Sequence, residues 1–237
     1  MPVITVSGNI ASGAREVGQA VAAQLGIGYV DRELMVDAAQ RIGVPVGAVE
    51  ERDERRGSFK ERLSSFFRTF LERSAASGAD PLTGATGLEV VLSRTYAEMA
   101  AEREEPQISG ETYLKTMTAV IRELATRGDI IILGRGSQMI LADLPQALQV
   151  LFVAPRKLRA QRLAEREGLD QEEADRKTLE SDRARCSFYK KFWHVDLEDP
   201  KLYDLSIDTG RLSFETATEL VMAAAKAKAA SAPGSRD

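Results

Sequence analysis

The segment with the clearest capacity for chemistry lies near the start of the chain, where residues 3–16 read VITVSGNIASGARE. A β-branched apolar run gives way to a turn rich in glycine and serine, and a helical pattern follows. In a loop of this kind, successive backbone N–H groups and the positive end of the helix converge on a polyphosphate, and glycines permit its close approach. The sequence therefore predicts a phosphate-binding loop. Its predicted nucleotide-binding residues are Gly8, Asn9, Ile10, Ala11, Ser12, Gly13, Ala14, Arg15 and Glu16.

Two positions of this loop differ from the common pattern Gly-x-x-x-x-Gly-Lys-Ser/Thr, in which the lysine reaches the β/γ-phosphates and the hydroxyl ligates magnesium. Gly8 and Gly13 have the right spacing, but Ala14 replaces the lysine and Arg15 replaces the hydroxyl residue. The backbone could still hold phosphate, and Arg15 could supply charge because a guanidinium binds phosphate bidentately. The alternative is an ordinary connection between a strand and a helix.

Two more polar residues follow apolar runs. Arg135 stands between two glycines directly after the β-branched run of residues 130–133, and Asp31 follows the short run of residues 27–30. If these runs are parallel strands, their carboxyl ends meet at one edge of a sheet, and the glycine loop, Asp31 and Arg135 converge there. The alternatives are a surface ion pair for Arg135 and a helix N-cap for Asp31.

A lone histidine near the end of the chain raises the question of a metal site. His194 is followed by Asp196, Glu198 and Asp199. A single histidine in a loop bounded by proline is more often structural than a ligand, since metal sites usually combine several histidine or cysteine ligands. We therefore assign no residue to a metal site.

Strands and helices alternate along the chain, which is typical of an open parallel sheet covered by helices. The predicted strands span residues 3–7, 27–30, 129–133, 147–153 and 203–208. The predicted helices span residues 13–25, 34–42, 111–127, 137–141, 156–166, 169–191 and 214–225, the sixth being one long helix or a pair. We expect residues 224–237, rich in Ala, Lys and Ser, to fray into a disordered tail, placed at 227–237.

One region interrupts this alternation. Residues 46–74 are highly charged and include an amphipathic stripe that indicates a helical excursion, and residues 75–87 read as a mobile loop. The stripe consists of Phe59, Leu63, Phe66, Phe67, Phe70 and Leu71. It either packs within its own lobe or forms a contact between two copies of the chain in a homodimer.

The bulk properties exclude several classes of protein. A net charge of −4 and a pI near 5.4 argue against non-specific binding to nucleic acid or to an anionic membrane. A single cysteine, Cys186, excludes an internal disulfide framework, and no apolar run reaches the roughly 18 residues of a membrane span. The chain starts in a strand with no signal-like segment, so we expect a cytoplasmic protein.

Taken together, these motifs resemble the cytidylate kinase-like family, relatives of bacterial cytidylate kinase among the nucleoside monophosphate kinases. The stretches that carry the resemblance are VITVSGNIASGAREVG, GIGYVDRELM, IIILGRGSQMIL, LFVAPRKLRAQRLAE, DRARCSFYKKF and YDLSIDTGRLSFETATELV. They cover nearly the whole chain apart from about residues 47–110 and the tail. Arg15 and Glu16 fit the loop of this family, Gly-Ser-Gly-Gly-Arg-Glu, whereas Ala11 and Ala14 stand where that pattern has glycine.

The resemblance implies a fold and a set of roles. The fold is the three-layer α/β/α arrangement of P-loop NTPases with a parallel central sheet, as one domain over residues 1–226 with a helical insertion at about 46–110 and a helical lid at about 170–200. Arg135, with Asp31 and Arg32, would contact the acceptor. Asp182, Arg183 and Arg185 would lie in the lid over the donor phosphates, although the alternative is a solvated helix face with i,i+4 ion pairs.

The leading hypothesis is an enzyme, an ATP-dependent kinase acting on a nucleoside monophosphate such as CMP, or on a related phosphorylated small molecule, with Mg²⁺ accompanying ATP by resemblance. Arg15, Arg183 and Arg185 would be its catalytic residues. The alternative is a nucleotide-binding or sensing domain without useful kinase activity, because the loop lacks its lysine and hydroxyl. A third hypothesis makes the phenylalanine stripe an interaction surface that the rest of the fold supports.

Overall fold

The computed structural model describes residues 2–43, 54–76, 84–101 and 109–230, with only the backbone described at 43, 54–58 and 84–86. The chain divides into two compact units. The first contains Met1–Tyr29, Thr95–Glu104 and Ile121–Asp237, and the second contains Val30–Arg94 and Glu105–Val120. Each unit is described by itself.

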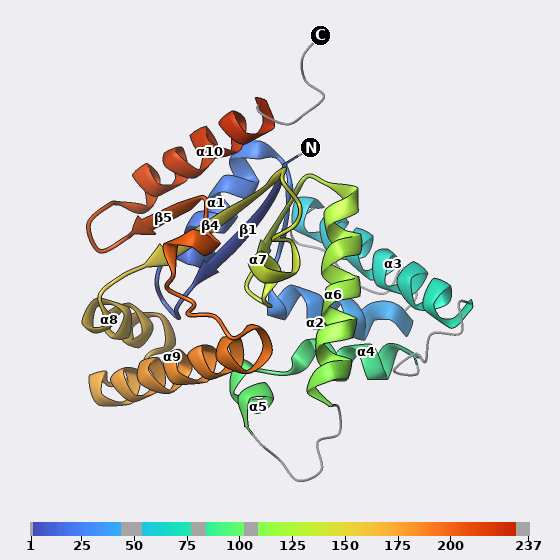
Figure 1. Cartoon of the computed structure of the whole chain (residues 1–237), viewed down its shortest axis with the longest axis horizontal. Coiled ribbons are helices and arrows are strands. Elements are labelled where there is room, and N and C mark those ends of the chain that lie inside the picture. The colour runs from blue at the N-terminus through green and yellow to red at the C-terminus, as the bar shows by residue number, and fades with distance from the viewer. Residues whose placement is uncertain (1, 44–53, 77–83, 102–108, 231–237) are drawn as a thin grey trace. The chain divides into compact units, whose positions relative to one another are not determined.

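A five-stranded sheet in the order β2-β3-β1-β4-β5 forms the centre of the first unit (Figure 1). The strands are β1 (Val3–Gly8), β2 (Gly28–Val30), β3 (Ile130–Leu133), β4 (Ala147–Val153) and β5 (Leu205–Asp208). β1 pairs in parallel with β3 and β4, and β4 pairs in parallel with β5. The β-branched and apolar side chains of β1, β3 and β4 are almost all buried, as expected for parallel strands covered on both faces.

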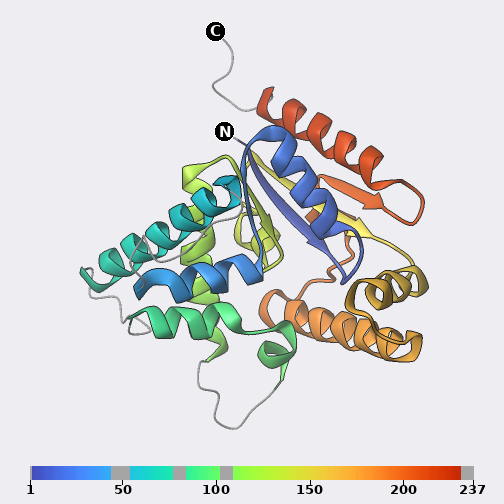
Figure 2. The ribbon, with the colours of Figure 1, turned by 180° about the vertical axis from the view of Figure 1, so that it is seen from behind.

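Helices cover both faces of this sheet, which confirms the predicted α/β architecture. Figure 2 shows α1 (Ala14–Leu25) and α10 (Phe214–Ala230) side by side on one face, and Figure 1 shows α7 (Ser137–Ile140) on the other. α8 (Arg156–Glu167) packs against α9 (Gln171–Trp193), and α9 also packs against α5 (Tyr96–Ala100). α9 is a single helix, one of the two arrangements expected for this segment.

The second unit is helical. It contains α2 (Arg32–Gln40), η1 (Arg41–Gly43), α3 (Glu54–Ala76), α4 (Gly84–Ser93) and the first part of α6 (Gly110–Arg127). Phe66 and Phe67 on α3 are 2% and 0% exposed and meet edge to face at 5.1 Å. The first of the two interpretations of the phenylalanine stripe, packing within its own lobe, is thereby confirmed for these two rings.

Two expectations about helix ends were wrong. The loop predicted for residues 75–87 overlaps both α3, which continues to Ala76, and α4, which begins at Gly84; residues 77–83 lie outside the described residues. α4 forms despite two glycines because Leu88, Val91 and Leu92 are buried, and tertiary packing outweighs helix propensity. α10 continues to Ala230 rather than fraying from residue 224, and residues 231–237 lie outside the described residues.

Candidate active site

The glycine loop between β1 and α1 has the expected position and a distinctive backbone. Ser12 N–H donates to the Asn9 carbonyl at 3.0 Å, which closes a turn inside the loop. Gly13 caps α1 with φ +85°, and a Cβ there would lie 2.6 Å from the Phe214 ring. Glycine is therefore required at this position for both its conformation and its space. Ala11 also adopts positive φ, +57°, which costs a residue with a side chain about 1–2 kcal/mol.

The interior of the loop is lined by its own small side chains. A Cβ at Gly8 would lie 2.4 Å from Ser12 Oγ and 2.8 Å from Ala14 Cβ, so these two side chains reach across the loop to its first glycine. Ser12 is 1% exposed, and among the residues that the structure describes its Oγ has no hydrogen-bond partner. Since buried hydroxyl groups are normally paired, this oxygen is a candidate contact for a bound anion or its counter-ion.

Two arginines of α8 contact the outer side of the loop. Arg159 Nη1 lies 3.4 Å from the Ile10 carbonyl oxygen, and Arg162 Nη1 lies 3.4 Å from the Ala11 carbonyl oxygen. In a trans peptide the carbonyl and the N–H of the next residue point in opposite directions. The N–H of Ala11 therefore faces away from Arg159.

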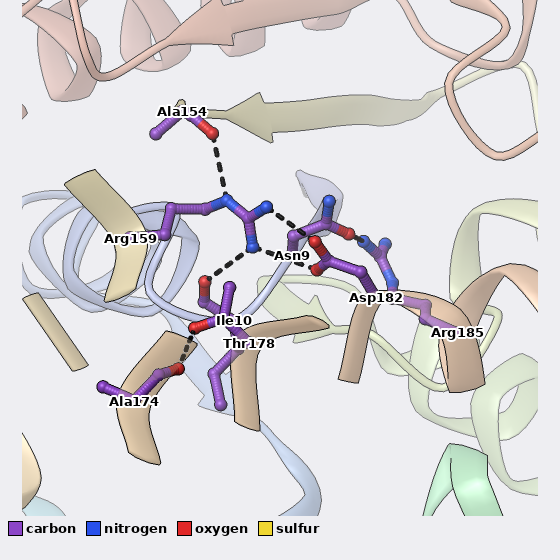
Figure 3. Close-up of polar contacts among 8 residues, drawn as sticks. All are labelled: Asn9, Ile10, Ala154, Arg159, Ala174, Thr178, Asp182 and Arg185. Carbon is purple, nitrogen blue, oxygen red and sulfur yellow. Dashed lines mark hydrogen bonds and ion pairs between the residues drawn. The ribbon is translucent and has the colours of Figure 1, made fainter. Parts of the chain in front are cut away.

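Arg159 also forms a buried ion pair that joins α8 to α9 (Figure 3). Its guanidinium donates to both carboxylate oxygens of Asp182, at 3.0 and 2.7 Å, and its Nε donates to the Ala154 carbonyl at 3.0 Å. The side chains of Arg159 and Asp182 are 5% and 23% exposed. Asp182 is therefore positioned by a bidentate contact rather than lying on a solvated helix face.

Arg185 extends from α9 to the glycine loop (Figure 3). Its Nη1 donates to Asn9 Oδ1 at 2.8 Å, and its Nη2 donates to Ser7 Oγ at 2.5 Å. The guanidinium lies 5.7 Å from the centre of the Tyr189 ring, and the residue is 4% exposed. A positive charge is thereby fixed beside a loop that lacks its own lysine. Arg183, predicted together with Arg185, is exposed on α9.

The other charged residues of the loop lie on the first turn of α1. Arg15 is half-buried, and Glu16 Oε1 lies 4.0 Å from Arg166 Nη1 of α8. The glycine loop, α8 and α9 are thus linked by charged side chains on several sides.

Arg135 lies in a tight turn directly after β3. Gly134, Arg135 and Gly136 all have positive φ, at +73°, +61° and +71°. The Arg135 N–H donates to the Tyr96 hydroxyl at 2.7 Å, and a Cβ at Gly136 would lie 2.4 Å from the Trp193 ring. Arg135 is 4% exposed, so the interpretation as a surface residue was wrong.

The turn and the glycine loop lie at the same edge of the sheet. Gly134 N–H donates to the Val6 carbonyl at 2.9 Å, because β3 and β1 are adjacent parallel strands. The structure therefore brings Arg135 and the glycine loop to the edge where ligands bind in open α/β sheets. Three successive left-handed residues, one of them an arginine, also indicate strain of the kind found at functional sites.

Two predicted acceptor residues belong to the second unit. Asp31 caps α2 by accepting the Leu34 N–H at 3.0 Å, and it is 5% exposed. The N-cap interpretation is confirmed, and a contact with an acceptor remains a prediction. Arg32 is exposed and donates through Nη1 to the Ser93 carbonyl at 3.3 Å.

Two tyrosines lie near Arg185, Tyr189 buried and Tyr203 half-buried. Burial raises the pKa of Tyr189 well above the ordinary tyrosine value, and burial also raises the pKa of Tyr203. Both phenols donate hydrogen bonds, Tyr189 to Gln138 Oε1 at 3.2 Å and Tyr203 to the Leu197 carbonyl at 2.9 Å. They therefore act as neutral donors at physiological pH.

His194 and Cys186 lie outside this chemistry. His194 caps the C-terminus of α9 with φ +57°, and its N–H donates to the Lys190 carbonyl at 3.2 Å. Cys186 is exposed, and Trp193 packs against Gly136. Within the described ranges, no group of three or more His, Cys, Asp or Glu could hold a metal ion. In the same part of the chain, every helix is too short or too polar to cross a membrane.

Sequence reasoning missed three residues that contact the loop, namely Arg159, Arg162 and Thr209. Their places in the chain could have pointed to them. Thr209 is the first residue after β5, and Arg159 and Arg162 lie three residues apart on the helix that follows β4. Side chains at this spacing share a helix face, here one next to the buried Ala160 and Leu163.

Comparisons with known proteins agree with this geometry. The profile of the cytidylate kinase-like family matches residues 3–211. A cytidylate kinase of Methanopyrus kandleri is 38% identical over 112 residues, which is 44% of this chain and 58% of that protein. A cytidylate kinase of Pyrococcus horikoshii is 31% identical over 162 residues, covering 63% of this chain and 83% of that protein.

Among solved structures, an uncharacterized protein from Eubacterium ventriosum superposes with a TM-score of 0.61. That match has 15% sequence identity and covers 95% of this chain and 99% of the other. At this identity the likeness concerns the fold alone.

Proposed function

The chain belongs to the cytidylate kinase-like family, and from this premise we propose that it transfers the γ-phosphoryl group of ATP to a nucleoside monophosphate. The acceptor we propose is CMP or a nucleotide like it, by analogy with the relatives described as cytidylate kinases. The observation that carries the proposal is Arg185, a buried guanidinium fixed beside the glycine loop by Asn9 and Ser7.

Phosphoryl transfer needs positioning and positive charge around the migrating group, and little covalent chemistry. In this proposal the backbone N–H groups of the glycine loop and the N-terminus of α1 hold the donor phosphates. Arg15 and Arg185 supply the charge that a lysine at position 14 would otherwise provide. Arg135 binds the phosphate of the acceptor. The acceptor contacts predicted for Asp31 and Arg32 of the second unit are separate proposals.

Magnesium would accompany ATP and neutralise part of the phosphate charge. In sites of this kind Mg²⁺ is held largely by substrate phosphates and water. One group that fits is the Ser12 hydroxyl, a buried loop oxygen that no described residue pairs by a hydrogen bond.

A second function is favoured by one specific observation. Ala14 and Arg15 replace the lysine and the hydroxyl residue of the common loop, and a domain that binds nucleotide as a signal needs neither. The two proposals differ in turnover. A sensing domain binds nucleotide and releases it unchanged.

The test is ADP formation by the purified chain with Mg-ATP and a panel of nucleoside monophosphates, with nucleotide binding measured by calorimetry. The kinase proposal predicts turnover with a pyrimidine monophosphate and its loss in Arg135→Ala, while the circular dichroism spectrum is unchanged. A matched control is Arg176→Met, which removes an exposed arginine of α9 whose Nη1 lies 3.5 Å from Glu180 Oε1. Tight binding of ATP with no turnover for any acceptor would favour the sensing domain instead.

A further inference from the structure

Thr209 occupies a central place behind the glycine loop. It is the first residue after β5 and is 3% exposed. Its hydroxyl accepts a hydrogen bond from Arg162 Nη1 at 2.9 Å and donates one to the Ser12 carbonyl at 2.8 Å. The Thr209 carbonyl accepts from Arg162 Nη2 at 2.8 Å, and its N–H donates to the Val153 carbonyl at 2.9 Å. Every polar group of Thr209 is therefore engaged.

This arrangement makes the hydroxyl a relay between a cation and a loop peptide. A hydroxyl that accepts from a guanidinium becomes a stronger donor, because successive hydrogen bonds polarise one another. The acceptor here is the carbonyl of the peptide that joins Ser12 to Gly13. The N–H of Gly13 lies at the opposite end of that peptide, so polarising the carbonyl increases the positive charge that Gly13 presents.

The surroundings leave this peptide little freedom. The Arg162 guanidinium lies 5.0 Å from the centre of the Phe214 ring, and the same ring contacts Gly13 so closely that a Cβ would approach to 2.6 Å. Gly13 is also the N-cap of α1, where orphan N–H groups and the helix dipole attract anions.

We propose that Thr209 is a positioning residue for the donor phosphates. Its hydroxyl transmits the polarising effect of the Arg162 charge to the Ser12 carbonyl, and it fixes the Gly13 N–H toward the ligand. This proposal rests on the proposed function, in which the glycine loop binds the phosphates of ATP. It provides a second route, besides Arg185, by which the chain offsets the absence of a lysine at position 14.

The test replaces Thr209 by Val, which keeps the shape of the side chain and puts a methyl group in place of the hydroxyl. Thr178→Val is the matched control, because Thr178 is equally buried, at 0% exposure, and its hydroxyl donates to the Ala174 carbonyl within α9 (Figure 3). Thr209→Ser is the conservative variant that retains the hydroxyl. Binding of Mg-ATP, Mg-ADP and adenosine is measured by calorimetry for all four proteins.

We expect Thr209→Val to weaken Mg-ATP and Mg-ADP binding about tenfold, the loss typical of one charge-assisted hydrogen bond. Adenosine affinity should change less than about twofold, because adenosine has no phosphate to contact Gly13. Thr209→Ser should restore most of the affinity, and Thr178→Val should bind as the wild type does. Equal losses for adenosine and Mg-ATP, or no rescue by serine, would overturn the proposal.

A second measurement separates this inference from the proposed function. The amide nitrogen shift of Gly13 in an NMR spectrum responds to hydrogen bonding at the preceding carbonyl, without any nucleotide. A shift in Thr209→Val but not in Thr178→Val supports the relay even if the wild type binds no nucleotide, a result that would refute only the proposed function. A Gly13 resonance unchanged by Thr209→Val would overturn the relay itself.

Discussion

The ion pair between Arg159 and Asp182 joins two helices beside the glycine loop, and removing either partner is expected to destabilise the fold. Removing one partner of a buried pair costs about 3–5 kcal/mol, since the remaining charge is left without compensation. The side chain of Asp182 is 23% exposed, so for Arg159→Met we expect a loss of stability at the lower end of this range, about 3 kcal/mol. This loss corresponds to a fall in Tm of roughly 6–12 °C. Asp182→Asn should cost about 2 kcal/mol, because Arg159 retains the Ala154 carbonyl.

The assay is denaturant unfolding of both single variants and the double variant. The free energy of unfolding should fall less in the double variant than the sum of its falls in the two single variants, by a coupling energy of about 1.5 kcal/mol. The chain offers an exposed control pair in Arg122 and Asp143. Arg122 Nη2 donates to both carboxylate oxygens at 2.8 and 2.9 Å, and the two side chains are 49% and 66% exposed. Exposed pairs contribute little, so its coupling should be much smaller. If the coupling between Arg159 and Asp182 proved no larger than that of the control, this reasoning would be refuted.

Three further predictions concern the loop and a buried phenol. Gly13→Ala should abolish nucleotide binding and destabilise the fold by more than about 2 kcal/mol, because the added Cβ meets the Phe214 ring. The control Gly26→Ala, at φ +66° with open space around it, should cost only about 1 kcal/mol. Calorimetry measures nucleotide binding, and thermal unfolding measures the loss of stability. Ala11→Gly should raise stability by about 0.5–1 kcal/mol, since it relieves a positive φ of +57°, and a loss measured by denaturant unfolding would refute the strain. Because the pKa of Tyr189 is raised in the folded state, its contribution to stability is complete below about pH 10 and is lost as the pH rises further. Tyr189→Phe should therefore flatten the alkaline part of the profile of stability against pH. An unchanged profile would exclude this phenol as the cause.

Most helices and strands could be predicted from the sequence because local residue patterns mark them. The run VITVSG and the run ALQVLFV are apolar and bounded by turn signals, and they form β1 and β4. α4 was missed because Gly84 and Gly87 resemble a loop, and its stability comes from buried apolar contacts that propensity does not report.

The contacts of the site were harder to predict than its position. The glycine loop and the turn at Arg135 follow from strand ends, which a sequence reveals. The contacts of Arg159 with Ile10 and of Thr209 with Ser12 join residues 149 and 197 positions apart, so they depend on how the helices pack. A charged helix such as α8 looks the same in sequence whether its arginines face solvent or a loop.

Transfer of radiolabel from [γ-³²P]ATP to CMP tests the central claim most directly, because it distinguishes phosphoryl transfer from hydrolysis and from binding alone. We expect labelled CDP with the wild type and at least a hundredfold less label with Arg185→Met, since a charge-stabilising group of this kind contributes about 10²–10³ in rate. Label that remains in ATP, or appears only in inorganic phosphate, while Mg-ATP binds to the protein, would contradict it.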